Sequence, residues 1–269
     1  MSYYQGKRIL ITGAGSGIGA LLAEQLGRQG AEVIVTGRRR APIESVARRV
    51  LAAGGQAHAR LLDVSVLEEI DPFRRQLHAD IGTIDILINN AGVVFGGPFD
   101  EVPLADHLNT LQVNTLGLMA MAHAFMGDLR AASQGHLVNI ASASAYIGLP
   151  FGSTYAASKW AVLGFSESLR LELKERRINN VAVTTVCPGY ISTGMFEGAR
   201  TPLLSPMLTP ERVVRSILRG IRQRRPLVVE PPMVRGIDLL KGALPGPVWD
   251  TLAKRSGIAS SMKYWQGKQ

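Results

Sequence analysis

Short apolar runs alternate with longer stretches in which apolar residues recur every three or four positions along this chain. The runs are rich in Val, Ile and Leu with few polar interruptions, which is typical of strands buried on both faces of a sheet. The longer stretches have the period of amphipathic helices. We predict strands at residues 8–12, 33–36, 57–62, 85–89, 136–141, 181–186 and 227–230. We predict helices at residues 20–29, 42–53, 66–79, 104–131 (one helix or two), 154–175 and 210–224.

Strands and helices that alternate in this way form a parallel sheet, because each helix returns the chain to the starting edge of the sheet. The expected fold is therefore α/β: a doubly wound (Rossmann) seven-stranded parallel sheet with helices on both faces. Such folds bind ligands at the carboxyl ends of their strands. No repeat or linker divides residues 1–269, which we interpret as a single domain. Residues 231–269 follow the last strand and are expected to form a C-terminal helical appendage, with short helices at 237–243 and 248–254.

A glycine-rich segment, residues 12–19 (TGAGSGIG), lies between the first predicted strand and the first predicted helix. Glycines in this position allow a tight turn and a close approach of the backbone to a pyrophosphate, and the helix N-terminus supplies free N–H groups for the phosphates. The segment therefore predicts a dinucleotide site. The expected contacts are Gly13, Ser16, Gly17, Ile18 and Gly19.

The end of the second strand distinguishes the two nicotinamide cofactors. A carboxylate here holds the ribose 2′-hydroxyl of NAD, whereas arginine accommodates the 2′-phosphate of NADP. The chain has Gly37, Arg38 and Arg39 at this place and no carboxylate, so we predict that NADP(H) is preferred over NAD(H). Loops after the third and fourth strands should contact the adenosine half. The residues concerned are Asp63, Val64, Asn90, Ala91 and Gly92.

Composition narrows the class of protein. Hydrophobic residues make up 46% of the 269 residues and charged residues 19%, which is typical of a globular chain. Neither a signal peptide nor a run of about eighteen apolar residues is present, so we expect a cytoplasmic protein. The single cysteine, Cys187, excludes an internal disulfide and a multi-cysteine metal site, and we expect no metal.

The net charge of +9 leaves several interpretations open. The excess cations, many of them after residue 210, can form a solvated basic face or attract an acidic partner or anionic lipid. We expect no nucleic acid as a partner, because no binding motif accompanies the charge. Peripheral contact with an anionic membrane is our hypothesis for the C-terminus, where cations are mixed with apolar residues. Those apolar residues are Leu239, Leu240, Leu244, Trp249 and Trp265.

Tyr155 and Lys159 are four residues apart in a predicted helix, and Ser142 precedes Tyr155 by thirteen residues. Residues four apart lie on one helix face, so an ammonium lies near the phenol. A free phenol has a pKa of about 10, and a neighbouring cation favours the phenolate. We therefore expect Lys159 to lower the pKa of Tyr155 into the range useful for proton exchange with an alcohol or carbonyl.

Taken in order, these motifs resemble the short-chain dehydrogenase/reductase family between about Gly6 and Leu227. The resemblance implies a sheet order of 3-2-1-4-5-6-7 and a catalytic tetrad of Asn114, Ser142, Tyr155 and Lys159. In that tetrad Tyr155 is the general acid or base, Lys159 also holds the nicotinamide ribose, Ser142 binds the substrate oxygen, and Asn114 positions a water that links Lys159 to solvent. The nicotinamide is expected beside Pro188, Gly189, Ile191 and Thr193.

A narrower resemblance to the retinol dehydrogenase and epidermal retinol dehydrogenase branch covers residues 192–198, 210–213 and 257–265. Members of that branch act on retinoids, steroids and other lipophilic alcohols or carbonyls. We expect this chain to differ from them in having no N-terminal membrane helix, and it has no acidic residue at the place that gives several members an NAD preference.

We expect a bulky lipophilic carbonyl or alcohol as the substrate, because residues 195–208 are mostly apolar and form a candidate lid. Met195, Phe196, Leu203, Leu204, Met207 and Leu208 supply its apolar side chains. The substrate-pocket candidates are Ser144, Phe151, Tyr190, Met195 and Phe196.

Three alternatives stay open beside this hypothesis: a 3-oxoacyl-[acyl-carrier-protein] reductase, oxidation of sugars or short polyols, and a non-catalytic nucleotide-sensing or interaction protein. We also expect a homodimer or homotetramer, because related folds pair through the helices at 116–129 and 157–173. Trp160, Phe165, Leu169 and Leu173 recur near helical spacing in the second of these, as either a core stripe or an interface.

Overall fold

The structure, a computed structural model, describes residues 2–202 and 206–265. All strand pairs in its seven-stranded sheet are parallel, in the order β3-β2-β1-β4-β5-β6-β7. This confirms the predicted fold class and strand order. The strands are β1 (Arg8–Ile11), β2 (Glu32–Gly37), β3 (Gln56–Leu61), β4 (Ile86–Asn89), β5 (Gly135–Ile140), β6 (Val181–Pro188) and β7 (Leu227–Glu230).

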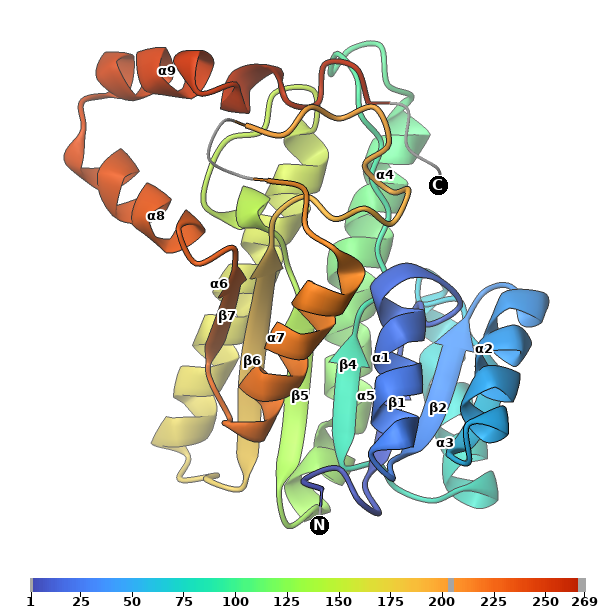
Figure 1. The fold of residues 1–269 in the computed structure, drawn as a ribbon. Coiled ribbons are helices and arrows are strands. Elements are labelled where there is room, and N and C mark those ends of the chain that lie inside the picture. Colours follow the sequence, from blue (N-terminus) through green and yellow to red (C-terminus); the bar gives the residue numbers. More distant parts are fainter. Residues whose placement is uncertain (1, 203–205, 266–269) are drawn as a thin grey trace.

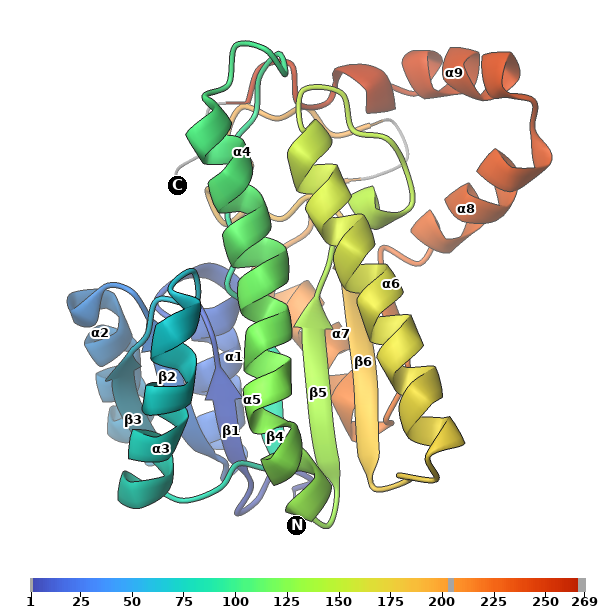
Figure 2. The same ribbon diagram turned by 180° about the vertical axis from the view of Figure 1, so that it is seen from behind.

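Helices cover both faces of the sheet (Figures 1 and 2). One face carries α1 (Gly17–Arg28), α2 (Arg40–Ala52) and α7 (Pro210–Arg222). The other carries α3 (Ile70–Asp80), α5 (Leu118–Ala131) and α6 (Ser153–Glu175), while α4 (Leu104–Leu111) extends beyond the carboxyl ends of the strands. The last two helices, α8 (Val234–Ala243) and α9 (Gly246–Arg255), belong to the C-terminal appendage.

The alternation of side chains along β1 explains the two layers. Ile9 and Ile11 pack with α1, α2 and α7 in one core, whereas Leu10 packs with α3 and α5 in the other. All three side chains are fully buried, and each such burial contributes about 1.5–3 kcal/mol to stability. The continuous apolar run predicted from the sequence is therefore a strand with a core on each side.

The predicted helix at 104–131 is two helices, α4 and α5, joined by a π-helical turn at Gln112–Gly117. π-Helical turns occur as single bulges inside α-helices, frequently at functional sites. This one contains Asn114, whose side chain is fully buried.

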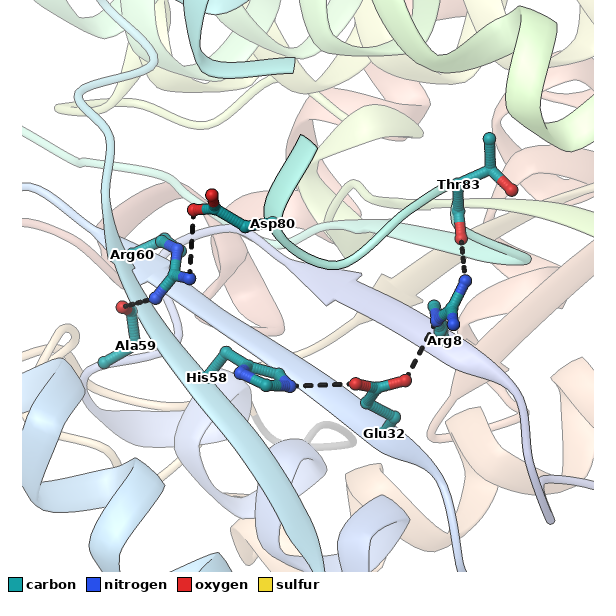
Figure 3. A network of polar contacts seen from close by, with 7 residues as sticks. All are labelled: Arg8, Glu32, His58, Ala59, Arg60, Asp80 and Thr83. Atoms are coloured by element: carbon teal, nitrogen blue, oxygen red, sulfur yellow. Dashed lines mark hydrogen bonds and ion pairs between the residues drawn. The ribbon is translucent and has the colours of Figure 1, made fainter. Parts of the chain in front are cut away.

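A polar network ties the amino-terminal side of the sheet together, away from the glycine-rich turn (Figure 3). Glu32 accepts a hydrogen bond from Arg8 at 2.9 Å and contacts His58 at 2.8 Å. Partial burial raises the pKa of Glu32, but the hydrogen bonds from His58 and Arg8 outweigh that effect and hold it below its usual range. Arg60 pairs with Asp80 at 3.2 Å in the same region. These contacts link β1, β2 and β3 to α3. They lie away from the carboxyl ends of the strands, where such folds bind ligands.

The appendage is anchored to α6 and then returns over the carboxyl end of the sheet (Figures 1 and 2). Nζ of Lys241 lies 4.5 Å from the centroid of the Trp160 ring and donates to the Tyr146 carbonyl at 3.4 Å. Arg235 donates to the Leu227 carbonyl at 3.1 Å. None of the helices in the described ranges is long and apolar enough to cross a membrane.

Candidate active site

The glycine-rich turn leaves no room for side chains on its inner side. Gly13 has a φ of +62°, and a Cβ there would lie 2.7 Å from the Cα of Ala91. A Cβ at Gly19 would lie 2.5 Å from Nδ2 of Asn90. That amide donates to the carbonyls of Thr12 and Gly13 at 2.9 and 3.1 Å. Asn90 and Ala91, both predicted cofactor contacts, therefore hold the turn in shape.

The mouth of the turn fits a pyrophosphate. Ser16 is the N-cap residue of α1. Its side chain makes no capping hydrogen bond, so it does not occupy the backbone amides of the first helical turn. Such amides bind anions. A Cβ on Gly17 would lie 3.6 Å from the Cβ of Thr193, which places the segment after β6 directly beside the turn. Gly17, Ile18 and Thr193 thus meet where the sequence predicts the cofactor.

Arg38 and Arg39 are exposed where β2 ends at Gly37. Neither side chain makes a hydrogen bond or ion pair with any residue that the structure describes, whereas Arg40 pairs with Glu44 at 3.5 Å. Two uncommitted guanidinium groups at this edge suit a phosphate ligand.

The loop after β3 is more constrained than the sequence indicates. Oδ1 of Asp63 accepts hydrogen bonds from the Ser65 amide at 2.9 Å and from its hydroxyl at 2.6 Å. Val64 is buried. Asp63 therefore has only its second oxygen for an adenine amino group.

The structure brings the predicted tetrad together at the carboxyl end of β5. Tyr155 and Lys159 are buried in the first two turns of α6. Ser142 follows β5, accepts a hydrogen bond from the Ser144 amide at 3.1 Å, and forms a side-chain hydrogen bond with Tyr155. Nζ of Lys159 lies 5.7 Å from the centroid of the Tyr155 ring and donates to the Ile140 carbonyl at 3.0 Å.

Asn114 faces Lys159 across Gly92. A Cβ on Gly92 would lie 3.2 Å from Oδ1 of Asn114 and 3.5 Å from Nζ of Lys159. The Asn114 amide is itself held by both backbone groups of Val93, at 2.8 and 2.9 Å, and by Ser158 at 3.0 Å. These hydrogen bonds fix the Asn114 side chain beside Gly92, where a larger residue would crowd Asn114 and Lys159.

The direction of the Tyr155 pKa shift differs from the sequence-based expectation. Burial raises the pKa of Tyr155 to about 12, and the hydrogen bond from Ser142 offsets only part of that effect. Burial also lowers the pKa of Lys159 to about 8. The expectation that Lys159 lowers the phenol pKa is therefore wrong for this structure, because desolvation of a fully buried phenol dominates. With that pKa Tyr155 is protonated at neutral pH.

An apolar cavity of about 280 Å³ opens from the Ser142 and Tyr155 side chains. The segment after β6 forms one wall, and the appendage forms much of the remainder. Appendage residues in the lining are Met233, Val234, Ile237, Leu240, Trp249, Leu252, Ala253, Ser256, Ile258 and Ser261.

Three of the five predicted pocket residues, Ser144, Tyr190 and Phe196, line this cavity. Phe151 and Met195 pack in the hydrophobic cluster beside it and are not part of its lining. Gly189 lines the cavity as well. The Ser144 hydroxyl is buried and has no hydrogen-bond partner in the described ranges. Buried polar groups without a partner are rare in proteins.

The appendage is the part of the site that sequence reasoning missed. Leu240 and Trp249 belong to the apolar set on which the membrane hypothesis depends, and the structure shows that both line the cavity. The indole N–H of Trp265 donates to the Met195 carbonyl at 2.8 Å, and Trp265 packs against the hydrophobic cluster that contains Tyr155. A signal was present: Val234, Ile237 and Leu240 recur every three residues, as on the buried face of a helix.

The predicted lid at residues 195–208 is tied at both ends. Ile191 forms an isolated β-bridge with Leu208, and the Ser192 amide donates to the Leu208 carbonyl at 3.0 Å. Pro188 ends β6, and Ile191 is buried beside it. Leu203 and Leu204 lie outside the described residues.

Known proteins share both the sequence and the fold. Residues 7–203 match the family model for short chain dehydrogenases. The chain is 38% identical to mouse epidermal retinol dehydrogenase 2 over 267 residues, covering 98% of this chain and 86% of that protein. It is 31% identical to human estradiol 17-beta-dehydrogenase 11, covering 89% and 80% of the two chains.

Two solved structures are similar in fold. A short-chain dehydrogenase/reductase from Burkholderia phymatum in complex with NAD has a TM-score of 0.80 at 24% identity, with 89% of this chain and 94% of that chain covered. A metagenomic short-chain oxidoreductase in complex with NADP has a TM-score of 0.71 at 30% identity, with 85% and 98% covered. With the family match over residues 7–203, these likenesses show that the chain belongs to the short-chain dehydrogenase family and is an oxidoreductase.

Proposed function

We propose that this protein is an NADP(H)-dependent oxidoreductase that interconverts a lipophilic carbonyl and the corresponding alcohol, with Tyr155 as the general acid or base. The observation that carries the proposal is the apolar cavity whose lining includes Tyr155 and Ser142. A carbonyl bound there has two O–H groups within reach and otherwise meets hydrocarbon.

The protein's part in the reaction is the movement of one proton. A nicotinamide cofactor bound beside Tyr155 and Lys159 would supply the hydride in reduction. The Tyr155 O–H gives its proton to the carbonyl oxygen, and the Ser142 hydroxyl stabilises the charge that develops on that oxygen. The phenolate recovers a proton from the Lys159 ammonium, whose pKa of about 8 makes it a ready donor near neutral pH. Oxidation follows the same path in reverse.

The preference for NADP(H) rests on charge at the end of β2. Arg38 and Arg39 are exposed, and neither side chain makes a hydrogen bond or ion pair with a described residue. A guanidinium binds phosphate by two parallel hydrogen bonds, and no carboxylate is present there to hold a ribose 2′-hydroxyl.

The proposal of a lipophilic substrate depends on the apolar lining of the cavity. Aliphatic and aromatic side chains from the segment after β6 and from the appendage make up most of the lining. Sugars and short polyols would leave many hydroxyls without partners against such a wall, at a cost of about 1–3 kcal/mol each. The relatives named for retinol and estradiol support the same class.

Cofactor titration followed by turnover tests this proposal. The purified protein is titrated with NADPH and NADH by calorimetry, and then assayed with lipophilic ketones and aldehydes. We expect tenfold or tighter binding of NADPH, about 1.4 kcal/mol, and turnover that Tyr155→Phe lowers about 10²–10⁴-fold. Equal binding of the two cofactors contradicts the preference, and a Tyr155→Phe variant that turns over at the wild-type rate contradicts the mechanism.

We further propose a homodimer or homotetramer that pairs through α5 and α6. Of the predicted stripe, Leu173 is buried in the core and Phe165 and Leu169 are partly buried against it, whereas Trp160 is 45% exposed. Leu116, in the π-helical turn before α5, and Leu171 are also about half exposed. Light scattering at micromolar concentration checks this, and a monomer refutes it.

Peripheral contact of a cytoplasmic protein with an anionic membrane is a second proposal, carried by α8. Leu239 is 79% exposed and lies between the cations Arg235 and Lys241. Flotation with phosphatidylserine vesicles at low salt checks it, and recovery of all protein in the unbound fraction refutes it.

A further inference from the structure

One hydroxyl in the apolar cavity has no part in the proton transfer. Tyr190 follows Gly189 at the end of β6 and lines the cavity together with Tyr155 and Ser142. Its ring contacts the Phe196 ring edge-on, with centroids 5.3 Å apart. Tyr155 contacts the same ring from 6.0 Å. The two phenols therefore share an aromatic neighbour, and both Tyr190 and its hydrogen-bond partner Ser261 line the cavity.

A chain of hydrogen bonds orients the Tyr190 hydroxyl. Oη of Tyr190 donates to Oγ of Ser261 at 2.8 Å, and Oγ of Ser261 donates to the Ile258 carbonyl at 2.9 Å. Both hydroxyl protons are thereby committed. The Tyr190 oxygen is left with lone pairs and no proton to offer, so it can only accept a hydrogen bond from the cavity.

The orientation is held by buried groups from a distant part of the chain. Ser261 is 2% exposed, and its carbonyl accepts a hydrogen bond from the Arg200 amide at 2.8 Å. Burial raises the pKa of Tyr190, so its proton stays in the bond to Ser261 at neutral pH. The acceptor is therefore part of a rigid wall.

We propose that the Tyr190 oxygen is a recognition site for a second hydroxyl on the substrate, so that the cavity selects lipophilic hydroxyketones and diols over compounds with a single oxygen. This rests on the proposed function, since it assumes that the reacting oxygen lies between Tyr155 and Ser142. A polar group in an apolar wall discriminates strongly between substrates. A substrate without a matching donor displaces water from the Tyr190 oxygen and leaves that acceptor without a hydrogen bond.

A matched pair of ketones tests the site. One is a rigid fused-ring ketone, and the other carries one added hydroxyl on the ring remote from the carbonyl. We expect wild-type protein to favour the hydroxyketone about fivefold in kcat/KM, equivalent to about 1 kcal/mol. In Tyr190→Phe that ratio should fall to about one. In Ser261→Ala the phenol proton is released into the cavity, so the preference should move from the hydroxyketone towards the corresponding diketone.

Tyr264→Phe is the matched control. It removes a phenol hydroxyl from the same C-terminal segment, at a side chain that is 48% exposed and makes no hydrogen bond with described residues. We expect it to keep the wild-type ratio. A Tyr190→Phe ratio equal to that of wild type, or a wild-type ratio of one, overturns the proposal.

A binding measurement separates this proposal from the proposed function. The affinities of the two ketones for NADPH-loaded Tyr155→Phe protein are compared by calorimetry, with and without Tyr190→Phe. A fivefold difference that Tyr190→Phe removes supports the recognition site even when the wild type turns neither ketone over. Equal affinities overturn it even when turnover is normal.

Discussion

Lys159→Met should make this protein more stable while it destroys activity. Lys159 is buried, and its desolvation lowers its pKa from 10.5 to about 8. This difference corresponds to about 3 kcal/mol by which the charged side chain opposes folding at pH 7. Methionine has a similar length and no charge. It leaves the Ile140 carbonyl without its 3.0 Å partner, at a cost of about 1 kcal/mol. The net gain is about 2 kcal/mol.

The pH dependence of that gain has a definite sign. Between about pH 8 and 10.5 the unfolded chain binds a proton at Lys159 that the folded protein has lost, so the stability of the wild type rises with pH in this window. The advantage of Lys159→Met is therefore full at pH 7 and mostly lost by about pH 9.5.

Thermal unfolding without cofactor measures both effects. For a chain of this size, about 2 kcal/mol corresponds to a rise of about 4 °C in Tm at pH 7. Lys174→Met, which removes an exposed lysine from the same helix, is the control and should leave Tm unchanged. A Tm for Lys159→Met at or below that of wild type at pH 7, or a difference that does not change with pH, would refute the reasoning.

Three further substitutions test the site. Tyr155→Phe should lower kcat about 10²–10⁴-fold with NADPH affinity retained, and loss of cofactor binding would point to a structural role. Arg38→Ala should weaken NADPH tenfold or more and leave NADH nearly unaffected, with Arg40→Ala, which removes an arginine paired with Glu44, as the control. Trp249→Ala should raise KM for bulky ketones through lost contact area without changing kcat. An unchanged KM would place the substrate elsewhere.

The C-terminal appendage forms much of the wall of the proposed substrate cavity. Tyr190 is joined to Ser261, and Met195 to Trp265, by hydrogen bonds between the C-terminal segment and the loop after β6. These hydrogen bonds hold the described parts of the loop against the appendage. Substrate selectivity should therefore depend on residues 231–265 as much as on the loop itself.

The strands, their parallel pairing and the cofactor turn were determined by the sequence alone. Ile9, Leu10 and Ile11 are consecutive and apolar, which is typical of a strand with a core on each side. Gly13 and Gly19 stand where a side chain would strike Ala91 or Asn90, so their spacing predicts the turn. Tyr155 and Lys159 are also local, being one helical turn apart.

Tertiary structure alone decided the pKa of Tyr155, the residues that pack against the substrate and the orientation of Tyr190. Desolvation depends on everything around a phenol, and a four-residue spacing reports only one neighbour. Periodicity shows that a helix has an apolar face but not what that face meets, so Leu240 and Trp249 fit a membrane or a cavity equally well until the fold places them. The bond from Tyr190 to Ser261 joins residues 71 positions apart. Contacts of that range leave no local pattern, because they arise from the packing of the whole chain.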